Sequence, residues 1–392
     1  MRTSTLLVLV GAVLLMLIFM ITDPKTTLEY SKCGVLLWFN AVLPALFPFF
    51  VLCELMIPLG IVRLLGVMLD PIMRPLFNLP GESSFAVAMG FVSGFPMGAV
   101  LTRRLLDERL VTPGEAGRLV AFTNNASPLF ILGYVGVGLF GSAEVGYLLA
   151  ASHYLSNLMI GIYLGFQDRR GINTINKPDV AMEIKEILRS TALSLKNPGL
   201  LLGASITNAL VNIAKIGGFV VVFSVITGLL STHGFIPGIG SILQFFGLSY
   251  TAGVGLGVGL FEMTLGAKSL AQSQGAFLEQ LLAVSVVLAW AGLSIQSQIL
   301  SIIAGSSIKF GPYFRARLMQ PVISMGLVYV GNLIYPLTNT TLASEPMTPY
   351  LPGGFFMCAY TSIETALLAI VLVFAFSFSA LLFTTIWKLT FK

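Results

Sequence analysis

Apolar runs long enough to cross a bilayer recur along this chain, and they constrain its fold more than any other feature. Four of them cover residues 5–21, 200–230, 281–303 and 366–386. Each approaches or exceeds the ~18–20 residues that a helix needs to span the hydrocarbon core. Only 10% of the residues are charged and the mean hydropathy is +0.90, whereas a soluble domain carries about 25% charged residues. The sequence therefore predicts an all-α integral membrane protein.

The residues that usually carry metal or nucleotide chemistry are few and scattered. The chain has three cysteines (Cys33, Cys53 and Cys358) and two histidines (His153 and His233), and it contains neither HExxH nor a phosphate-binding GxxxxGK[ST] motif. We therefore expect no metal site and no cofactor. No nucleophile–base pair is visible, so we do not expect an enzyme. A net charge of +5 is ordinary for a membrane protein with basic cytoplasmic loops and does not indicate a nucleic-acid partner.

Hydropathy predicts about eight transmembrane helices and two re-entrant hairpins. The predicted helices cover residues 5–22, 36–60, 119–140, 145–166, 205–230, 281–306, 319–337 and 360–387. The hairpins are the apolar segments 84–101 and 250–272, which Gly, Pro, Ser and Thr interrupt. The sequence leaves open whether these two segments are re-entrant or cross the membrane fully.

The distribution of Lys and Arg gives this topology an orientation. With the amino terminus inside, 18 of the basic residues, Arg315 and Arg317 among them, fall on the cytoplasmic side and 3 fall outside, while Lys215 lies within a span. Short cytoplasmic loops carry such an excess of positive charge. We therefore expect both the amino and the carboxyl terminus to be cytoplasmic.

Five regions follow from this topology. They are an N-terminal transmembrane helix (1–27), a first repeat (28–166), a cytoplasmic loop with an amphipathic helix (167–198), a second, inverted repeat (199–337), and an outer loop with a C-terminal transmembrane helix (338–392). The first helix is expected to be retained, because no small-x-small cleavage site follows it. An amphipathic helix in the loop would lie on the inner surface of the membrane.

Weak internal similarity supports the inverted repeat. A shift of 168 residues places GFPMGAV (94–100) over EMTLGAK (262–268), which superimposes Gly98-Ala99 on Gly266-Ala267. Each half then reads as a spanning helix, a small-residue hairpin and a helix interrupted by polar residues. Transporters built from inverted repeats place their substrate site near the midplane, where the broken helices of the two halves meet.

Four polar, helix-breaking motifs mark the candidate site: SGFPMG (93–98), TNNASP (123–128), EMTLGAKS (262–269) and SIQSQ (294–298). Inside the membrane, a broken helix survives only against protein or a wet cavity. The candidate substrate-binding residues are Ser93, Pro96, Gly98, Thr123, Asn124, Asn125, Ser127, Thr264, Gly266, Lys268, Gln296, Ser297 and Gln298. The alternative is that these residues only join helices, since Asn and Ser form hydrogen bonds between membrane helices.

Glu262 is the most informative single residue among these motifs, because a carboxylate inside an apolar hairpin usually faces a pathway or a partner. We interpret Glu262 as a residue for coupling or gating. It could instead form a structural pair with Lys268, six residues later. Lys268 could attract an anion or extend to the outer surface.

The stretch SGFPMGAVLTRRLLDERLVTPGEAGRLVAFTNNASPLFILGYVG (93–136) resembles the signature of the YlbJ-type (SpoVV) sporulation integral membrane proteins. That group is similar to the wider Gate, or nucleoside-recognition, membrane proteins. The flanking VLPALFPFFVLCELM, GLFEMTLGAKSLA and SIQSQILSI fit the same pattern, so the resemblance covers residues 28 to 330.

The resemblance implies a secondary or facilitated carrier that moves dipicolinic acid, a small organic anion, across the outer forespore membrane during sporulation. It also implies location in the cell membrane or outer forespore membrane. The partners we expect are the anion and membrane lipid, and a homo-oligomer is a further possibility. Two other functions stay open, a nucleoside or nucleobase carrier and a sporulation scaffold that transports nothing.

Overall fold

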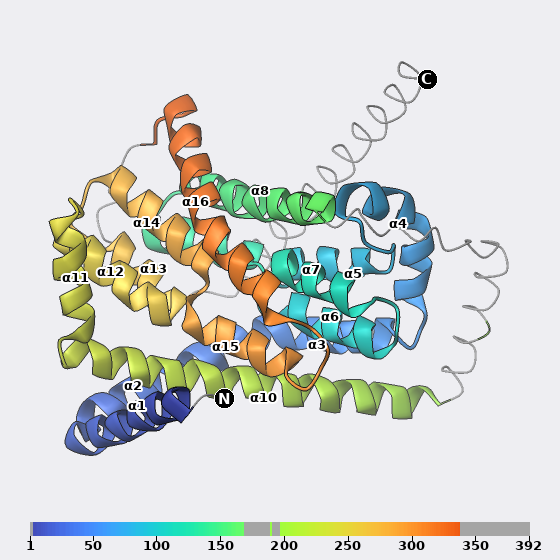
Figure 1. Ribbon diagram of the computed structural model, residues 1–392, viewed down its shortest axis with the longest axis horizontal. Helices are drawn as coiled ribbons and strands as arrows, with labels where there is room; N and C mark the ends of the chain where they lie inside the picture. The colour runs from blue at the N-terminus through green and yellow to red at the C-terminus, as the bar shows by residue number, and fades with distance from the viewer. Residues whose placement is uncertain (1–2, 168–188, 190–196, 338–392) are drawn as a thin grey trace.

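The computed structural model describes residues 3–167, 189 and 197–337, and these form helices joined by short turns (Figure 1). No strand occurs in these ranges. The predicted C-terminal helix (360–387) and the amphipathic helix of the loop fall on residues outside them. The all-α prediction is confirmed for the part of the chain that the structure describes.

The chain starts with two bent helix pairs. Its first elements are α1 (Thr3–Thr22), α2 (Pro24–Leu37), the π-helix η1 (Trp38–Val42), α3 (Leu43–Met56) and α4 (Ile61–Phe77). The chain bends by 103° between α1 and α2, and by 85° between α3 and α4. At the first bend the Asp23 carboxylate accepts a hydrogen bond from the Thr26 N–H at 3.1 Å, and Pro24 begins α2. The span predicted over 36–60 is therefore wrong in its bounds: α3 ends at Met56 and belongs to an almost continuous run from Pro24.

A hairpin, a broken helix and a long helix complete the first half. They are α5 (Ser83–Val92), α6 (Met97–Asp107), α7 (Pro113–Thr123), the π-helix η2 (Leu129–Leu139) and α8 (Ala143–Gln167). The hairpin predicted over 84–101 corresponds to α5 and the start of α6, which residues 93–96 separate. The span predicted over 119–140 is broken at TNNASP, as expected, between α7 and η2.

The second half repeats this order of elements after a long helix. Its elements are α10 (Pro198–Thr232), α11 (Phe235–Phe245), α12 (Tyr250–Phe261), α13 (Met263–Ala271), α14 (Phe277–Trp290), α15 (Gly292–Ile303) and α16 (Phe310–Ile334). Thus α12 and α13 follow one another as α5 and α6 do, α14 and α15 form a second broken helix, and α16 follows as α8 follows η2.

One predicted break lies at a different place. We expected SIQSQ to interrupt the second broken helix, but those residues are helical in α15, and the interruption is at Ala291 and Gly292. Both residues have left-handed backbone conformations, with φ of +68° and +71°. A side chain at Gly292 would lie 3.0 Å from the carbonyl oxygen of Phe261, so this break packs directly against the end of α12.

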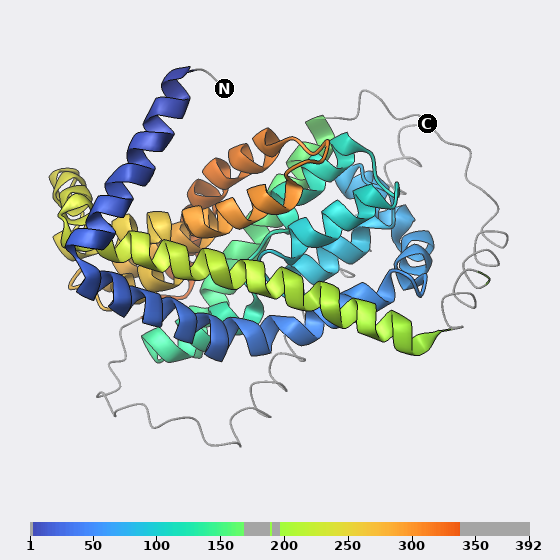
Figure 2. The ribbon, with the colours of Figure 1, turned by 90° about the horizontal axis from the view of Figure 1, so that it is seen from below.

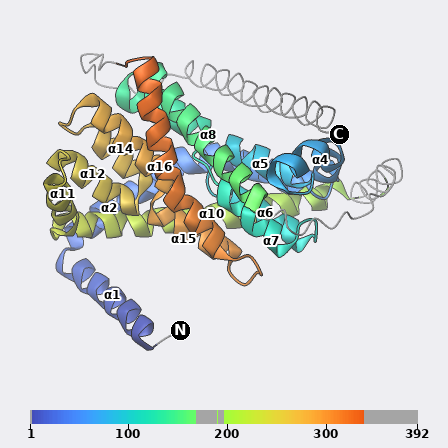
Figure 3. The same cartoon turned by 45° about the horizontal axis from the view of Figure 1, so that its top comes forward.

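The two halves pack against each other at several places. In Figure 2, α10 runs beside α2 and continues along α3, and these helices are in contact. Helix α16 crosses the molecule obliquely and contacts α7, α8 and α14 (Figure 3). Helix α6 of the first half contacts α15 of the second. By contrast, α1 projects from the rest of the molecule.

The described helices have the length and surface of a membrane protein. Three spans are long and apolar enough to cross a bilayer, Ala143–Gln167, Pro198–Thr232 and Phe277–Ile303, and counting each bent pair as one span gives five. Large apolar side chains such as Leu200, Leu210 and Val222 are exposed along α10. Surfaces of this kind lie in lipid rather than water. The chain is therefore an integral membrane protein.

Candidate functional site

The break of the first hairpin packs directly onto the TNNASP break. Gly94 has a φ of +86°, and a side chain there would meet Ser127 at 2.8 Å. Gly98 faces the backbone of Thr123, whose carbonyl carbon would lie 2.6 Å from an added Cβ. Glycine at these two positions lets the backbone of the hairpin approach the broken helix closely. The two motifs that the sequence singled out in the first half are therefore one structural unit.

The polar side chains of TNNASP bind backbone groups at the break. Thr123 donates a hydrogen bond to the carbonyl of Leu119 at 2.7 Å. Asn124 accepts one from the Ala99 N–H at 2.9 Å and donates one to the carbonyl of Val120 at 2.7 Å. Both side chains are fully buried. Asn124 thus links the end of α7 to the first turn of α6.

Asn125 continues the network toward α8. Its amide donates to the carbonyl of Phe122 at 3.2 Å, and its side-chain oxygen accepts a hydrogen bond from Asn157. The side-chain oxygen of Asn157 in turn accepts one from Arg317 at 2.8 Å. Asn125 and Asn157 are fully buried. The predicted residues Thr123, Asn124 and Asn125 are thus brought together, with their donors bonded to protein.

Arg317 holds the ends of both broken helices, and here the charge-based topology needs a correction. We counted Arg317 in a cytoplasmic loop, but it lies in α16 and is fully buried. Its guanidinium donates to the carbonyls of Ala121 at 3.3 Å, Asn124 at 3.2 Å and Ala289 at 3.3 Å. Carbonyls at the end of a helix lack partners within the helix and carry partial negative charge. One buried cation therefore stabilises the ends of α7 and α14 together.

Helix α8 supplies partners for the backbone between Asn125 and Pro128. His153 accepts a hydrogen bond from the Ala126 N–H at its Nε2 (3.1 Å), and the hydroxyl of Tyr154 donates to the Ala126 carbonyl at 2.9 Å. Two adjacent side chains thus bind both backbone groups of one residue. Gln320 of α16 donates to the carbonyl of His153 at 3.3 Å.

Sequence reasoning missed these supporting residues. His153 was considered only as a metal ligand, and Arg317 only as a loop charge. A polar stripe was nevertheless present in the apolar helix α8, since Ser152, His153, Ser156 and Asn157 recur at intervals of three and four residues. In an apolar span such a stripe faces other protein groups.

The second hairpin is broken at Glu262, which is buried with 4% of its surface exposed. Glu262 precedes α13, and its carboxylate accepts a hydrogen bond from the Leu265 N–H at 2.6 Å and others from Thr264. It therefore caps the amino terminus of α13, an arrangement that stabilises both the helix and the carboxylate. No ion pair joins it to Lys268, which is exposed on α13.

The other predicted residues of the second half divide between packing and hydrogen bonding. Gly266 lies against the backbone of Gly259, so the two arms of this hairpin also approach closely. Gln296 donates to the carbonyl of Trp290 at 3.1 Å across the break in the helix. Gln298 donates to Ser294 at 3.5 Å, a long bond, and Ser297 is partly exposed. The two glutamines therefore lie within α15, just after the break, and are not part of the interruption itself.

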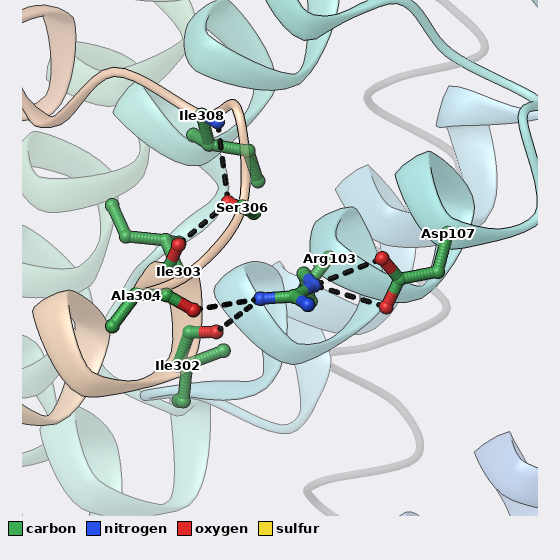
Figure 4. Close-up of polar contacts among 7 residues, drawn as sticks. All are labelled: Arg103, Asp107, Ile302, Ile303, Ala304, Ser306 and Ile308. Carbon is green, nitrogen blue, oxygen red and sulfur yellow. Dashed lines mark hydrogen bonds and ion pairs between the residues drawn. The ribbon is translucent and has the colours of Figure 1, made fainter.

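The two sets of breaks meet across the halves. Helix α13 of the second half contacts η2 of the first. Arg103 of α6 donates to the carbonyls of Ile302 at 3.4 Å and Ala304 at 3.0 Å, and it pairs with Asp107 at 2.9 Å (Figure 4). These contacts place the predicted motifs of both halves in one region of the molecule.

A second ion pair ties the first hairpin to its surroundings. The carboxylate of Glu54 in α3 lies 3.7 Å from the guanidinium of Arg104 in α6 and accepts a hydrogen bond from Asn208 of α10 at 3.0 Å. Glu54 is buried, with 9% of its surface exposed. Its contacts join three helices.

Two hollows lie between elements of different halves. A small crevice of about 20 Å³ lies between α6, α10 and α15, and it is lined by Pro96, Val100, Asn212, Lys215, Ile216, Phe219, Gln298, Ser301 and Ile302. A larger, open hollow of about 350 Å³ lies between α8 and the end of α16 and is lined by Glu144, Tyr147, Leu148, Gly331, Tyr335 and Leu337. Among the predicted site residues, Pro96 and Gln298 line the small crevice. No group of three or more His, Cys, Asp or Glu residues in the described ranges is placed to hold a metal ion.

Comparison with known proteins gives four results. Residues 39–167 match a family model named Gate and described as nucleoside recognition. The chain is 39% identical over 328 residues to the sporulation integral membrane protein YlbJ of Bacillus subtilis, with 81% of this chain and 80% of that protein covered. It is 25% identical over 134 residues to an uncharacterized protein of Alkalihalophilus pseudofirmus, with 32% and 28% covered. No solved structure matches the chain.

Proposed function

Since this chain belongs to the family of the sporulation integral membrane protein YlbJ, we propose that it is a carrier that moves a small organic anion through the membrane. Dipicolinate is the proposed substrate and the outer forespore membrane the proposed location. The carrier works by secondary or facilitated transport, without a catalytic step.

The juxtaposition of broken helices from both halves carries this proposal. Backbone is interrupted near Pro96, Asn125, Glu262 and Gly292, and contacts across the halves hold these interruptions in one region. Interrupted helices in a membrane persist where they line a cavity or are enclosed by protein. In carriers built from two repeats, substrate sites lie where such helices meet.

The recurring order of elements supports an inverted repeat. Hairpin, broken helix and long helix follow one another in α5 to α8 and again in α12 to α16. With both termini in the cytoplasm, the two repeats enter the membrane from opposite sides. Movement of one repeat against the other then exposes the site to each side in turn.

The donor groups of the region suit a planar dicarboxylate. The hydroxyl of Ser93 is buried and makes no hydrogen bond within the described chain. The amide of Gln298, which makes only a long bond of 3.5 Å to Ser294, adds a neutral donor, and Glu262 serves for coupling or gating. Neutral donors and helix amino termini bind anions without a large desolvation cost.

A nucleoside or nucleobase carrier is the second candidate, and the description of the matching family model as nucleoside recognition favours it. Such a carrier would use the same amides to bind base edges. A third candidate is a membrane scaffold that transports nothing. Membrane lipid surrounds the protein in all three cases, and a homo-oligomer is compatible with each.

Uptake of labelled dipicolinate by liposomes that contain the purified protein tests the proposal. We expect uptake by the wild type and reduced uptake by Asn125→Ala and Glu262→Gln, with Lys32→Gln on the exposed face of α2 as a matched control. Varying pH and sodium in the same assay identifies the coupling ion.

Three outcomes contradict parts of the proposal. Absence of uptake by the wild type favours the scaffold. Competition by uridine or adenosine, with no uptake of dipicolinate, favours the nucleoside carrier. Unchanged uptake by both variants, with folding preserved, rules out their assigned roles.

A further inference from the structure

The small crevice between the two halves is built from one face of each of three helices. Helix α10 contributes Asn212, Lys215, Ile216 and Phe219, which recur at intervals of three or four residues. Val100 of α6 and Pro96, which directly precedes that helix, line another side, and α15 contributes Gln298, Ser301 and Ile302 at the same helical spacing. Residues so spaced lie on one side of a helix. The crevice is therefore a junction of three helices with a defined set of side chains.

Lys215 is the cation at the mouth of this crevice, where its side chain is exposed. It lies 17 residues from each end of α10 (Pro198–Thr232), which corresponds to about 25 Å of helix in either direction. Lys215 has no hydrogen bond or ion pair with any residue that the structure describes. An ammonium group in the middle of a membrane helix costs ~2.5–3.5 kcal/mol on insertion scales, and such groups usually face a pathway or a partner.

The crevice adds neutral polar groups and apolar walls to this cation. Asn212 lies one turn before Lys215 on α10, and Gln298 and Ser301 face it from α15. Gln298 is buried, with only 4% of its surface exposed, yet its amide makes only one long hydrogen bond, of 3.5 Å to Ser294. Phe219, Ile216 and Val100 supply apolar surface. One cation, several amide or hydroxyl donors and an aromatic ring match a small planar carboxylate.

We propose that this crevice is the carboxylate-binding site of the carrier, with Lys215 as the residue that pairs with the anion. Asn212, Gln298 and Ser301 donate hydrogen bonds to the same ligand, and the ring of Phe219 packs against it. This assignment rests on the proposed transport function and moves the cation of the site from Lys268 to Lys215.

The crevice is too small in this structure for a ligand with an aromatic ring. Its volume of about 20 Å³ has room for roughly one water molecule. A ligand with an aromatic ring therefore requires α6 and α15 to separate. Arg103, one turn beyond Val100 on α6, binds the carbonyls of Ile302 and Ala304 at the end of α15 (Figure 4). Arg103 is thus the contact that must break when the crevice opens.

Binding of labelled dipicolinate to the detergent-purified protein tests the site apart from transport. We expect Lys215→Gln to weaken binding by ~tenfold or more, since a charge-assisted bond is lost, and Lys215→Arg to retain part of it. Lys32→Gln, on the exposed face of α2, serves as the control. Binding that survives Lys215→Gln, or that is lost only in Lys268→Gln, overturns the assignment.

Thiol labelling gives a second measurement that needs no transport. Gln298→Cys is placed in a chain whose Cys33, Cys53 and Cys358 are replaced by serine, and a charged, water-soluble thiol reagent is added. We expect slow labelling that Arg103→Ala accelerates and dipicolinate suppresses. Failure to label Cys at 298 even with Arg103→Ala means that the crevice does not open to water, and the proposal is then wrong.

The two proposals can fail separately. If dipicolinate binding depends on Lys215 but liposomes show no uptake, the site assignment is supported and the transport function is contradicted. If uptake persists unchanged in Lys215→Gln, the transport function is supported and the site assignment is contradicted. Absence of both binding and uptake removes both.

Discussion

The two broken helices satisfy the backbone groups at their breaks with different side chains. The break between α7 and η2 is supported from outside, by Arg317, His153, Tyr154 and Asn157. The break between α14 and α15 is shorter, and it uses two left-handed residues, Gln296 of its own helix and one bond from Arg317. At the first break the polar side chains of TNNASP form hydrogen bonds to nearby backbone carbonyls. Near the second break, Gln298 makes only one long hydrogen bond.

This difference bears on how polar motifs in membrane proteins are interpreted. TNNASP is the more conspicuous motif in the sequence, but its donors are bonded to backbone. SIQSQ is less conspicuous, but one of its residues lines a crevice beside Lys215. A cluster of polar residues indicates that a helix is interrupted, and the contacts around it decide which donors remain for a ligand.

Removing Arg317 is the largest expected perturbation, because it affects both breaks. Arg317→Leu leaves the carbonyls of Ala121, Asn124 and Ala289 without this donor. We expect the free energy of unfolding to fall by about 3–5 kcal/mol, since buried groups lose charge-assisted hydrogen bonds. Thermal unfolding in detergent measures this loss. Arg317→Lys should be intermediate, because an ammonium lacks the planar fork of five donors. A loss below about 1 kcal/mol contradicts the shared role of Arg317.

The two hairpins can be compared directly by their matched glycines. Gly98 and Gly266, which are 168 residues apart, each pack against backbone of another segment. Gly98→Ala and Gly266→Ala should each lower the free energy of unfolding by about 1–3 kcal/mol, because an added methyl overpacks the contact. Gly218→Ala in α10, where nothing lies within 4 Å, is the control. A strong effect in one hairpin only would show that the two do not pack alike.

Asn124→Ala probes the first break alone. The substitution removes one acceptor for the Ala99 N–H and one donor for the Val120 carbonyl. We expect a loss of about 1–2 kcal/mol, because the Ala99 N–H keeps its bond to the Pro96 carbonyl while the other group loses a partner. Chemical or thermal unfolding in detergent provides the measurement. Wild-type stability would mean that Asn124 is free to serve a ligand.

Gln298→Ala should have the smallest effect on folding. Its bond to Ser294 is 3.5 Å long, so we expect the free energy of unfolding to change by less than about 1 kcal/mol. Binding of dipicolinate should nevertheless weaken severalfold, as measured with the purified protein. Loss of stability without loss of binding would mean that Gln298 stabilises the broken helix, as Asn124 does in the first half, and does not bind the ligand.

Several features of the fold could be predicted from the sequence because they depend on local patterns. Long apolar runs identify membrane helices, and proline with small residues located the breaks at Pro96 and Asn125. The break at Ala291 and Gly292 was missed because no proline or polar cluster marks it. Gly292 packs closely against the backbone of Phe261 and Met263, about 30 residues earlier, and a local pattern does not reveal such a contact.

The sequence by itself determined that this chain is helical, lies in a membrane and interrupts a helix at TNNASP. These properties follow from hydropathy and from residues that cannot continue a helix. Only the tertiary structure decided the partners of each polar group, as with Arg317 and Asn124, which are separated by 193 positions. The number of donors left for a ligand depends on such long-range pairings, because a buried polar group binds whatever partner the packing brings to it.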